Sequence, residues 1–183
     1  MNYIETEIKG VWVIEPRCFG DGRGYFMETF RLEEFRSAIG RPDLTFVQDN
    51  ESFSTRGVLR GLHLQRGAHS QAKLVRVSQG RVLDVAVDLR PGSPTFGRHV
   101  AIELSAENHR QLFIPHGFQV LSDTAQFQYK VDNLYCPESE ATLRFDDPDV
   151  AVAWPIPPAE SNLSPKDLRG LPLAEIASLV TAF

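Results

Sequence analysis

The chain has 183 residues, of which 42% are hydrophobic, 23% charged and 10% aromatic. This composition is typical of an ordinary globular protein and excludes a disordered tail, a fibre and a membrane-spanning protein. The 19 Lys and Arg residues against 24 Asp and Glu residues leave a formal net charge of −5. A nucleic-acid surface built on bulk positive charge is therefore not expected.

We expect one domain over residues 1–183, because a chain of this length buries about 70% of its surface without disulfides or metals. Cys18 and Cys136 stand far apart and form no C-x-x-C pair, which predicts two unpaired thiols in a reducing compartment. The first residues contain no basic region followed by an apolar run. These features predict a cytoplasmic protein without a membrane partner.

The predicted elements, in chain order, are short helices and strands. Residues 11–14 are strand-like and are a candidate for pairing with the sheet edge of another subunit. Leu32, Phe35 and Ile39 recur with helical spacing and predict a helix over residues 31–39. Six strands follow, at residues 73–77, 81–89, 98–104, 111–114, 118–121 and 125–131.

The strand at residues 81–89 has the clearest pattern. Its apolar odd-numbered residues share one face, whereas the even-numbered residues, including Asp84 and Asp88, share the other. Farther on, the Pro-rich residues 148–165 predict an extended connection laid over the strands, and the spacing after Pro172 predicts a docked helix. The series of short strands predicts an all-β sandwich or barrel with short peripheral helices.

Three stretches combine strand-forming residues with ionisable side chains. Three glycines surround Arg23, which predicts either a guanidinium presented to a phosphate or simply an exposed arginine in a turn. Residues 48–65 place Arg60 and His63 in an apolar strand, and the later polar turn ending at Asp167 can bring a carboxylate to a barrel mouth.

A divalent metal on a β-barrel requires a pattern such as His-x-His followed by Glu and a later His. His63 is instead followed by Leu64 and Gln65, and a Gly-containing turn separates it from His69. We therefore expect neither a metal nor another cofactor.

Acid–base chemistry without a metal needs a base of near-neutral pKa, a carboxylate that orients it, and an acid on the other side of the substrate. His63, Asp167 and Tyr129 suit these three roles. Tyr129 shares a strand face with Phe127 and Val131, so its hydroxyl enters the barrel if that face points inward. Taken singly, however, His63 and Tyr129 are more simply explained as core residues.

The combination of motifs resembles the dTDP-4-dehydrorhamnose 3,5-epimerase family. The resemblance extends over residues 10–167 and is carried by residues 21–30 (DGRGYFMETF), 57–63 (GVLRGLH), 71–75 (QAKLV), 80–88 (GRVLDVAVD), 93–97 (SPTFG), 129–130 (YK), 135–140 (YCPESE), 154–155 (WP) and 164–167 (SPKD). It implies a metal-free cupin-type double-stranded β-helix, a homodimer, and a dTDP-linked 4-keto-6-deoxy sugar as the substrate. The implied reaction inverts C3, C5 or both.

The resemblance also implies roles for individual residues. His63 matches the family's general base, Asp167 the carboxylate paired with it, Tyr129 the general acid, and Lys73 the lysine near the keto oxygen. Lys73 would stabilise the oxyanion that forms when the proton beside the ketone is removed. The implied substrate-binding residues are Arg23 and Arg60 for the diphosphate, with Phe26, Glu28, Gln48, Asn50, His116 and Tyr135 in the pocket.

The sequence departs from the family pattern at one connection. The family carries Pro-x-Gly-Phe-Ala-His-Gly-Phe there, whereas here Pro115 is followed at once by His116, Gly117 and Phe118. A shorter connection predicts a displacement of His116 and of Tyr129.

Arg60 and His63 have opposite parity and face one pocket only if the strand is irregular between them. We therefore predict an irregularity near Gly61.

Three functions remain open on these grounds. The leading one is an epimerase of dTDP-4-keto-6-deoxy sugars in a rhamnose-type pathway, including a C3-only or C5-only enzyme of a secondary-metabolite pathway. The second is a catalytically impaired sugar-nucleotide-binding protein. The third, a metal-dependent cupin, is disfavoured by the missing His-x-His.

Overall fold

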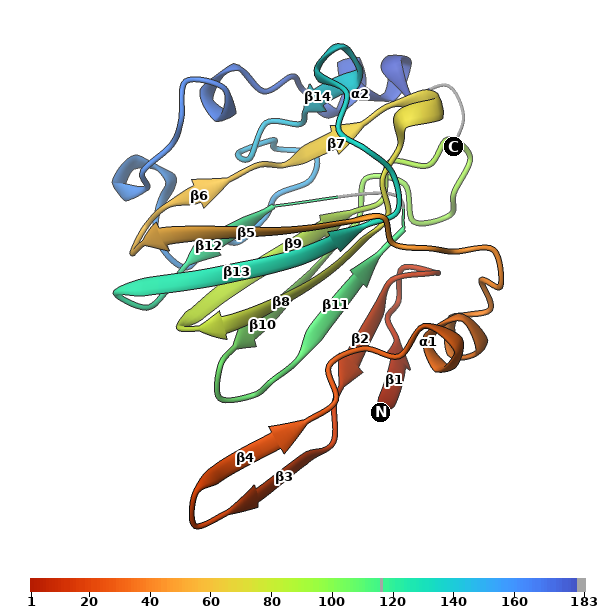
Figure 1. The fold of residues 1–183 in the computed structure, drawn as a ribbon. Helices are drawn as coiled ribbons and strands as arrows, with labels where there is room; N and C mark the ends of the chain where they lie inside the picture. Colours follow the sequence, from red (N-terminus) through yellow and green to blue (C-terminus); the bar gives the residue numbers. More distant parts are fainter. Residues whose placement is uncertain (116, 181–183) are drawn as a thin grey trace.

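The computed structural model describes residues 1–115 and 117–180, most of which belong to or connect antiparallel strands (Figure 1). Its helices are α1 (Leu32–Ile39) and α2 (Leu173–Leu179), with short 3-10 turns at Gly67–His69, Pro137–Ser139, Pro158–Glu160 and Asp167–Arg169. Its strands are β1 (Asn2–Glu5), β2 (Trp12–Glu15), β3 (Cys18–Asp21), β4 (Gly24–Met27), β5 (Gln48–Thr55), β6 (Leu59–Arg60), β7 (His63–Gln65), β8 (Lys73–Gln79), β9 (Arg81–Val87), β10 (His99–Ser105), β11 (Gln111–Ile114), β12 (Phe118–Val120), β13 (Thr124–Val131) and β14 (Glu140–Thr142).

Two larger sheets form the body of the molecule. One has the strand order β1-β2-β11-β8-β13-β5, and the other has the order β10-β9-β12-β6. Two-stranded ribbons are formed by β7 with β14 and by β3 with β4. Because β11, β12 and β13 follow one another in the chain but alternate between the two sheets, the sheets wind together as a jelly roll. This confirms the predicted all-β cupin-type barrel with short peripheral helices.

Strand β9 separates two apolar clusters. Val82 and Ala86 pack in the cluster between the two large sheets, whereas Val85 packs in a second cluster on the outer side of the smaller sheet. A strand buried on both faces reads as a nearly continuous apolar run, which explains the composition of β9. Asp84 has the same parity as Val82 and Ala86, so the alternation directs it inward as well.

The two helices close the outer faces of the barrel. Helix α1 covers the outer face of the six-stranded sheet, where the rings of Phe35 and Phe113 meet edge to face at 5.2 Å. The helix ends at Gly40, whose φ of 69° is the left-handed conformation common at helix C-termini. Helix α2 buries Leu173 and Ile176 in the cluster outside β9.

The chain between β14 and α2 runs over the smaller sheet. The Trp154 indole donates to the Phe145 carbonyl oxygen at 2.8 Å, and the Gln119 side chain of β12 donates to the Ile156 carbonyl oxygen at 2.8 Å. These contacts fasten the Pro-rich segment onto the barrel and confirm the predicted extended connection.

The prediction that residues 11–14 pair with another subunit is wrong. Strand β2 lies between β1 and β11 and forms antiparallel ladders with both. Both of its edges are therefore occupied within the chain. The edges of the six-stranded sheet are β1 and β5.

Candidate active site

A cavity of about 350 Å³ lies at one end of the barrel, between the six-stranded sheet and the strands β6 and β7. Its lining combines apolar side chains with an unusual number of ionisable ones. The lining residues are Ser52, Arg60, His63, Leu64, Gln65, Gln71, Lys73, Val75, Asp84, Ile114, Gly117, Phe118, Phe127, Tyr129, Tyr135, Glu140 and Lys166. All four predicted catalytic residues belong to this part of the molecule, because Asp167 hydrogen-bonds to His63 directly behind the wall.

His63 and Asp167 form a hydrogen-bonded pair although they are 104 positions apart in the chain. His63 Nε2 lies 2.7 Å from Asp167 Oδ1, and the Gly61 backbone N–H donates to the same oxygen at 3.0 Å. Ser164 Oγ donates to Asp167 Oδ2 at 2.5 Å. These bonds hold Asp167 in one orientation, and that orientation fixes the His63 ring.

The hydrogen-bond pattern identifies which His63 nitrogen can act as a base. An ionised carboxylate only accepts hydrogen bonds, so Nε2 of neutral His63 carries the hydrogen. Nδ1 then holds the lone pair.

The electrostatics keep both members of the pair in the required charge states. Burial lowers the pKa of His63, the nearby Lys166 lowers it further, and the Asp167 carboxylate opposes both. Burial acts to raise the pKa of Asp167, but hydrogen bonds from Ser164 and Gly61 outweigh it and lower that pKa. The pair is therefore a neutral imidazole beside a carboxylate at neutral pH.

Tyr129 reaches the cavity from the six-stranded sheet. It lies opposite Val75 of β8 and Asn50 of β5 in the strand register. The Phe127 ring lies 6.1 Å from the Tyr129 ring on the same inner face. Burial raises the pKa of Tyr129, and the Arg60 charge partly opposes this effect, so the hydroxyl keeps its proton at neutral pH.

Tyr129 lines the cavity although the connection that follows Pro115 is short. Tyr129 is held by two ladders, from β13 to β5 and from β13 to β8, and the second has a register shift between Gln126 and Phe127.

The predicted irregularity near Gly61 is present. Ladder pairing of β6 ends at Arg60 and that of β7 begins at His63, with a cis Gly61–Leu62 peptide bond between them. Gly61 has a φ of 122°, and a Cβ there would lie 2.8 Å from the Gly117 Cα, so only glycine fits. Arg60 and His63 consequently line the same cavity despite their opposite parity.

Lys73 and Tyr135 line the same cavity from different sides. Lys73 projects from β8 and is partly buried, and this burial lowers its pKa. The Tyr135 hydroxyl donates to Glu140 at 3.1 Å, and Glu140 also forms an ion pair with Lys166. The predicted catalytic set thus surrounds one cavity, with five further ionisable groups along its wall: Arg60, Asp84, Tyr135, Glu140 and Lys166.

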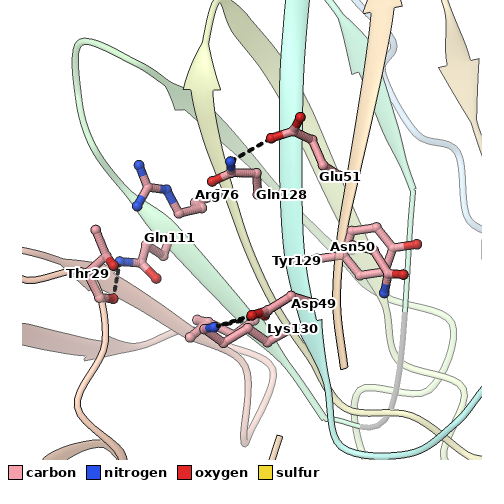
Figure 2. Close-up of a pocket in the computed structure, with 10 residues that line it drawn as sticks. Thr29, Asp49, Asn50, Glu51, Arg76, Gln111, Gln128, Tyr129 and Lys130 are labelled. Atoms are coloured by element: carbon pink, nitrogen blue, oxygen red, sulfur yellow. Dashed lines mark hydrogen bonds and ion pairs between the residues drawn. The ribbon is translucent and has the colours of Figure 1, made fainter. Parts of the chain in front are cut away.

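A second pocket, of about 320 Å³, lies on the outer face of the six-stranded sheet (Figure 2). The Lys130 ammonium pairs there with Asp49 at 2.8 Å, and Gln128 projects to the same side. Figure 2 shows the Tyr129 and Asn50 side chains on the other side of β13 and β5. Both residues also count among the lining residues of this outer pocket, whereas His63, Lys73 and Asp167 do not.

Comparison with known proteins agrees with the geometry of the site. The family model described as dTDP-4-dehydrorhamnose 3,5-epimerase matches residues 5–175. The dTDP-4-dehydrorhamnose 3,5-epimerase of Escherichia coli K12 is 51% identical over 183 residues, which is 98% of each chain. The chain belongs to the dTDP-4-dehydrorhamnose 3,5-epimerase family. It is an isomerase, and the activity of this family is 3,5-epimerisation of a dTDP-4-keto-6-deoxy sugar in dTDP-rhamnose biosynthesis.

Two further members of the family are also similar to this chain. A crystal structure of the dTDP-6-deoxy-D-glucose-3,5-epimerase of Legionella pneumophila in complex with dTDP-4-keto-L-rhamnose has a TM-score of 0.93. It is 46% identical and covers 100% of this chain and 98% of that chain. The dTDP-4-dehydrorhamnose 3-epimerase of Streptomyces niveus is 41% identical over 92% of this chain and 82% of its own. The family thus includes a protein named for epimerisation at C3 alone.

Three predicted substrate-binding residues of this family member lie away from its cavity. Arg23 is at the tip of the β3–β4 hairpin, where it pairs with Asp21 at 2.6 Å. Phe26 is 70% exposed on the same hairpin, and Glu28 pairs with Arg31 just beyond it. Figure 1 shows that the hairpin projects from the body on the side opposite β6 and β7. Within one chain, these residues do not contribute to the site.

The other predicted substrate-binding residues divide in the same way. Arg60 and Tyr135 line the cavity, as predicted. Gln48 and Asn50 do not line it, although they share strand parity with Ser52, which does. The Gln48 side chain donates to Asn50 at 2.7 Å. His116 lies outside the described residues.

Three ionisable residues in the cavity wall were given no role from the sequence. They are Asp84, Glu140 and Lys166. The sequence could have indicated Asp84 as a site residue, because the alternation of β9 directs its carboxylate inward among apolar residues. Glu140 begins the three-residue strand β14, and Lys166 precedes the 3-10 turn Asp167–Arg169, and both elements are too short to show a periodicity in the sequence.

Two further findings concern the described part of the chain. No group of three His, Cys, Asp or Glu side chains there is arranged to hold a metal ion. No helix within residues 1–115 or 117–180 is long and apolar enough to cross a membrane.

Proposed function

We propose that this protein epimerises dTDP-4-keto-6-deoxyglucose at both C3 and C5 through His63, Asp167, Tyr129 and Lys73. The observation that carries the proposal is the single cavity into which His63, Tyr129 and Lys73 project from different strands, with Asp167 fixed behind His63. The 4-keto group lies between C3 and C5, so one oxyanion site serves both carbons.

Each inversion begins with removal of the proton on the carbon beside the ketone. His63 Nδ1 accepts this proton, and the Asp167 carboxylate stabilises the imidazolium that results. The electron pair moves onto the 4-keto oxygen, where the Lys73 ammonium stabilises the enolate. The lowered pKa of His63 leaves it unprotonated and ready to act at neutral pH.

Inversion requires that the new proton arrive on the opposite face of the sugar ring. Tyr129 projects from β13, in a different sheet from His63, and its raised pKa keeps a proton on the hydroxyl. Tyr129 donates this proton to the carbon of the enolate, and the keto group is restored. With a single residue acting on one face, the proton would be exchanged without inversion.

The proposal includes a homodimer. The β3–β4 hairpin carries exposed Phe19, Tyr25 and Phe26, an arrangement typical of a surface that another chain covers. Its residues Arg23 and Phe26 match substrate-binding positions of the family yet lie away from their own cavity. Both features are explained if each hairpin completes the nucleotide site of a second copy.

The proposal also assigns the enzyme to the cytoplasm. Cys18 and Cys136 are both free, which suits a reducing compartment.

The test is to incubate the enzyme with dTDP-4-keto-6-deoxyglucose in D2O and to follow deuterium at C3 and C5 by NMR. We expect uptake and inversion at both carbons, loss of both in His63→Ala, and exchange without inversion in Tyr129→Phe. Uptake at one carbon only would make the protein a mono-epimerase. Nucleotide binding without any uptake would instead support an impaired sugar-nucleotide-binding protein.

A further inference from the structure

Asp84 is the most deeply buried ionisable group in the cavity wall. It lies in β9 opposite Ile102 and Phe118, and only 1% of it is exposed. Its Oδ2 atom is inaccessible to water and has no hydrogen-bond partner among the described residues. Burying a carboxylate without a hydrogen-bond partner costs free energy. We therefore expect a nearby charged group with which Asp84 interacts.

Lys73 is the cation that faces Asp84 across the cavity. The two side chains come from opposite sheets, β8 and β9, and both line the cavity. Among the described residues no ion pair or hydrogen bond joins them, and each affects the pKa of the other through its charge alone. Lys73 therefore stays available to a substrate oxygen while Asp84 acts on it through space.

The other acidic groups near the cavity already have hydrogen-bond or ion-pair partners. Asp167 accepts hydrogen bonds from His63, Ser164 and Gly61, and Glu140 is held by Lys166 and Tyr135. Lys166 and a protonated His63 both repel the Lys73 ammonium. Asp84 is thus the carboxylate in this wall that is left to balance Lys73.

We propose that Asp84 is a positioning residue that keeps Lys73 in its ammonium form, and thereby keeps the oxyanion site charged, without contacting the substrate. The proposal rests on the proposed role of Lys73 in stabilising the enolate. Burial favours a neutral amine, which cannot stabilise an oxyanion electrostatically. An ionised carboxylate across the cavity opposes that loss of charge.

The charge state of Asp84 makes the effect depend on pH. Burial raises the pKa of Asp84 to about 7, and Lys73 opposes this shift. Burial lowers the pKa of Lys73, while Asp84 and Glu140 raise it and Lys166 lowers it further. Below about pH 7 Asp84 is largely neutral, so replacing it has little effect on the charge of Lys73. Above about pH 7 the Asp84 side chain is ionised. Its negative charge then raises the pKa of Lys73 and keeps the buried amine protonated to a higher pH.

The experiment compares Asp84→Asn with the wild-type enzyme across the pH range. We expect the ratio of the two kcat values to stay near one at about pH 6 and to fall at least tenfold by about pH 9, since each pKa unit lost by Lys73 costs about tenfold above that pKa. Asp43→Asn, at an exposed acid of the loop after α1, is the matched control and should leave the ratio flat. A ratio for Asp84→Asn that is equally reduced at every pH would overturn the proposal.

A second measurement does not depend on catalysis. The Lys73 side chain is titrated by NMR in protein labelled with 13C at lysine Cε, with Lys73→Arg to assign the signal. We expect the Lys73 pKa to fall in Asp84→Asn and in Asp84→Ser, which removes the charge with a smaller group, and to be largely restored in Asp84→Glu. An unchanged Lys73 pKa would contradict the proposal. A lowered Lys73 pKa without any alkaline loss of kcat would retain the pairing and instead refute the role of Lys73 in the reaction.

Discussion

At the scale of single residues, the properties of His63 depend on a few named neighbours. Asp167 holds its ring, and Lys166 lies close enough to disfavour the imidazolium. Burial and Lys166 together lower the pKa of His63 below the ordinary histidine value of about 6.5. A base must be unprotonated to act, so the activity is expected to be lost only at a pH below that value.

This dependence predicts the effect of Lys166→Gln. Removing the ammonium eliminates a repulsion that disfavours protonated His63, so the pKa of His63 rises and the base is protonated at a higher pH. The acid limb of the kcat profile should therefore move to higher pH, with little change at alkaline pH. Profiles of kcat and KM measure the shift, and Arg169→Gln, at a neighbouring exposed cation, serves as the control. An unmoved acid limb in Lys166→Gln would show that Lys166 does not act on His63.

At the scale of elements, the turn between β9 and β10 is organised around one carboxylate. The buried Asp88 accepts from Arg90 Nε at 2.8 Å, from Ser93 Oγ at 2.6 Å and from Thr95 Oγ1 at 2.6 Å. Arg90 also donates to the Lys9 carbonyl oxygen at 2.8 Å. The same network therefore ties the segment before β2 to this end of the barrel.

Replacement of Asp88 by Asn should destabilise the fold. Burial acts to raise the pKa of Asp88, but hydrogen bonds from Arg90, Ser93 and Thr95 outweigh it and lower the pKa. We expect a loss of about 2 kcal/mol in the free energy of unfolding at neutral pH, since several bonds to a charged group are weakened.

The pH dependence of this loss follows from the direction in which folding shifts the pKa of Asp88. A depressed folded pKa stabilises the protein above the unfolded value of about 3.9, and the stabilisation disappears as the pH falls below it. Urea unfolding at several pH values measures the difference between wild type and Asp88→Asn. A difference that stays constant down to the acid range would assign the loss to packing rather than charge.

At the scale of the whole molecule, the position of the β3–β4 hairpin is the main unusual feature. It leaves the body of the barrel (Figure 1), and close to its tip the Tyr25 ring lies 4.8 Å from the His109 ring. A hairpin with exposed aromatic residues is expected to be covered by another chain. The proposed homodimer assigns the hairpin to the partner's site.

Coexpression of Arg23→Ala with His63→Ala tests this assignment. If the hairpin serves the second copy, each mixed dimer contains one site with both defects and one intact site. Half of randomly assembled dimers are mixed, so the preparation should regain about one quarter of wild-type activity. If Arg23 serves its own chain, every site carries a defect, and no activity returns. Each variant expressed alone provides the baseline, and sedimentation confirms that dimers are present.

The sequence predicted the apolar strands better than the polar ones. All six strands expected between residues 73 and 131 are present as β8 to β13, because their alternation reflects burial on known faces. Strand β5 was not recognised, since its inward side carries Gln48, Asn50 and Ser52 rather than apolar residues. A strand that lines a polar cavity loses the pattern by which strands are recognised.

By itself, the sequence determined the all-β class, the inward side of β13 and, through its family motifs, the residues of the candidate site. These depend on local alternation and on residue identity at short spacing. The tertiary structure alone decided that Asp167 lies 2.7 Å from His63, that Asp84 faces Lys73, and that Arg23 and Phe26 lie away from their own cavity. These facts depend on how distant segments meet across sheets, which no local pattern encodes.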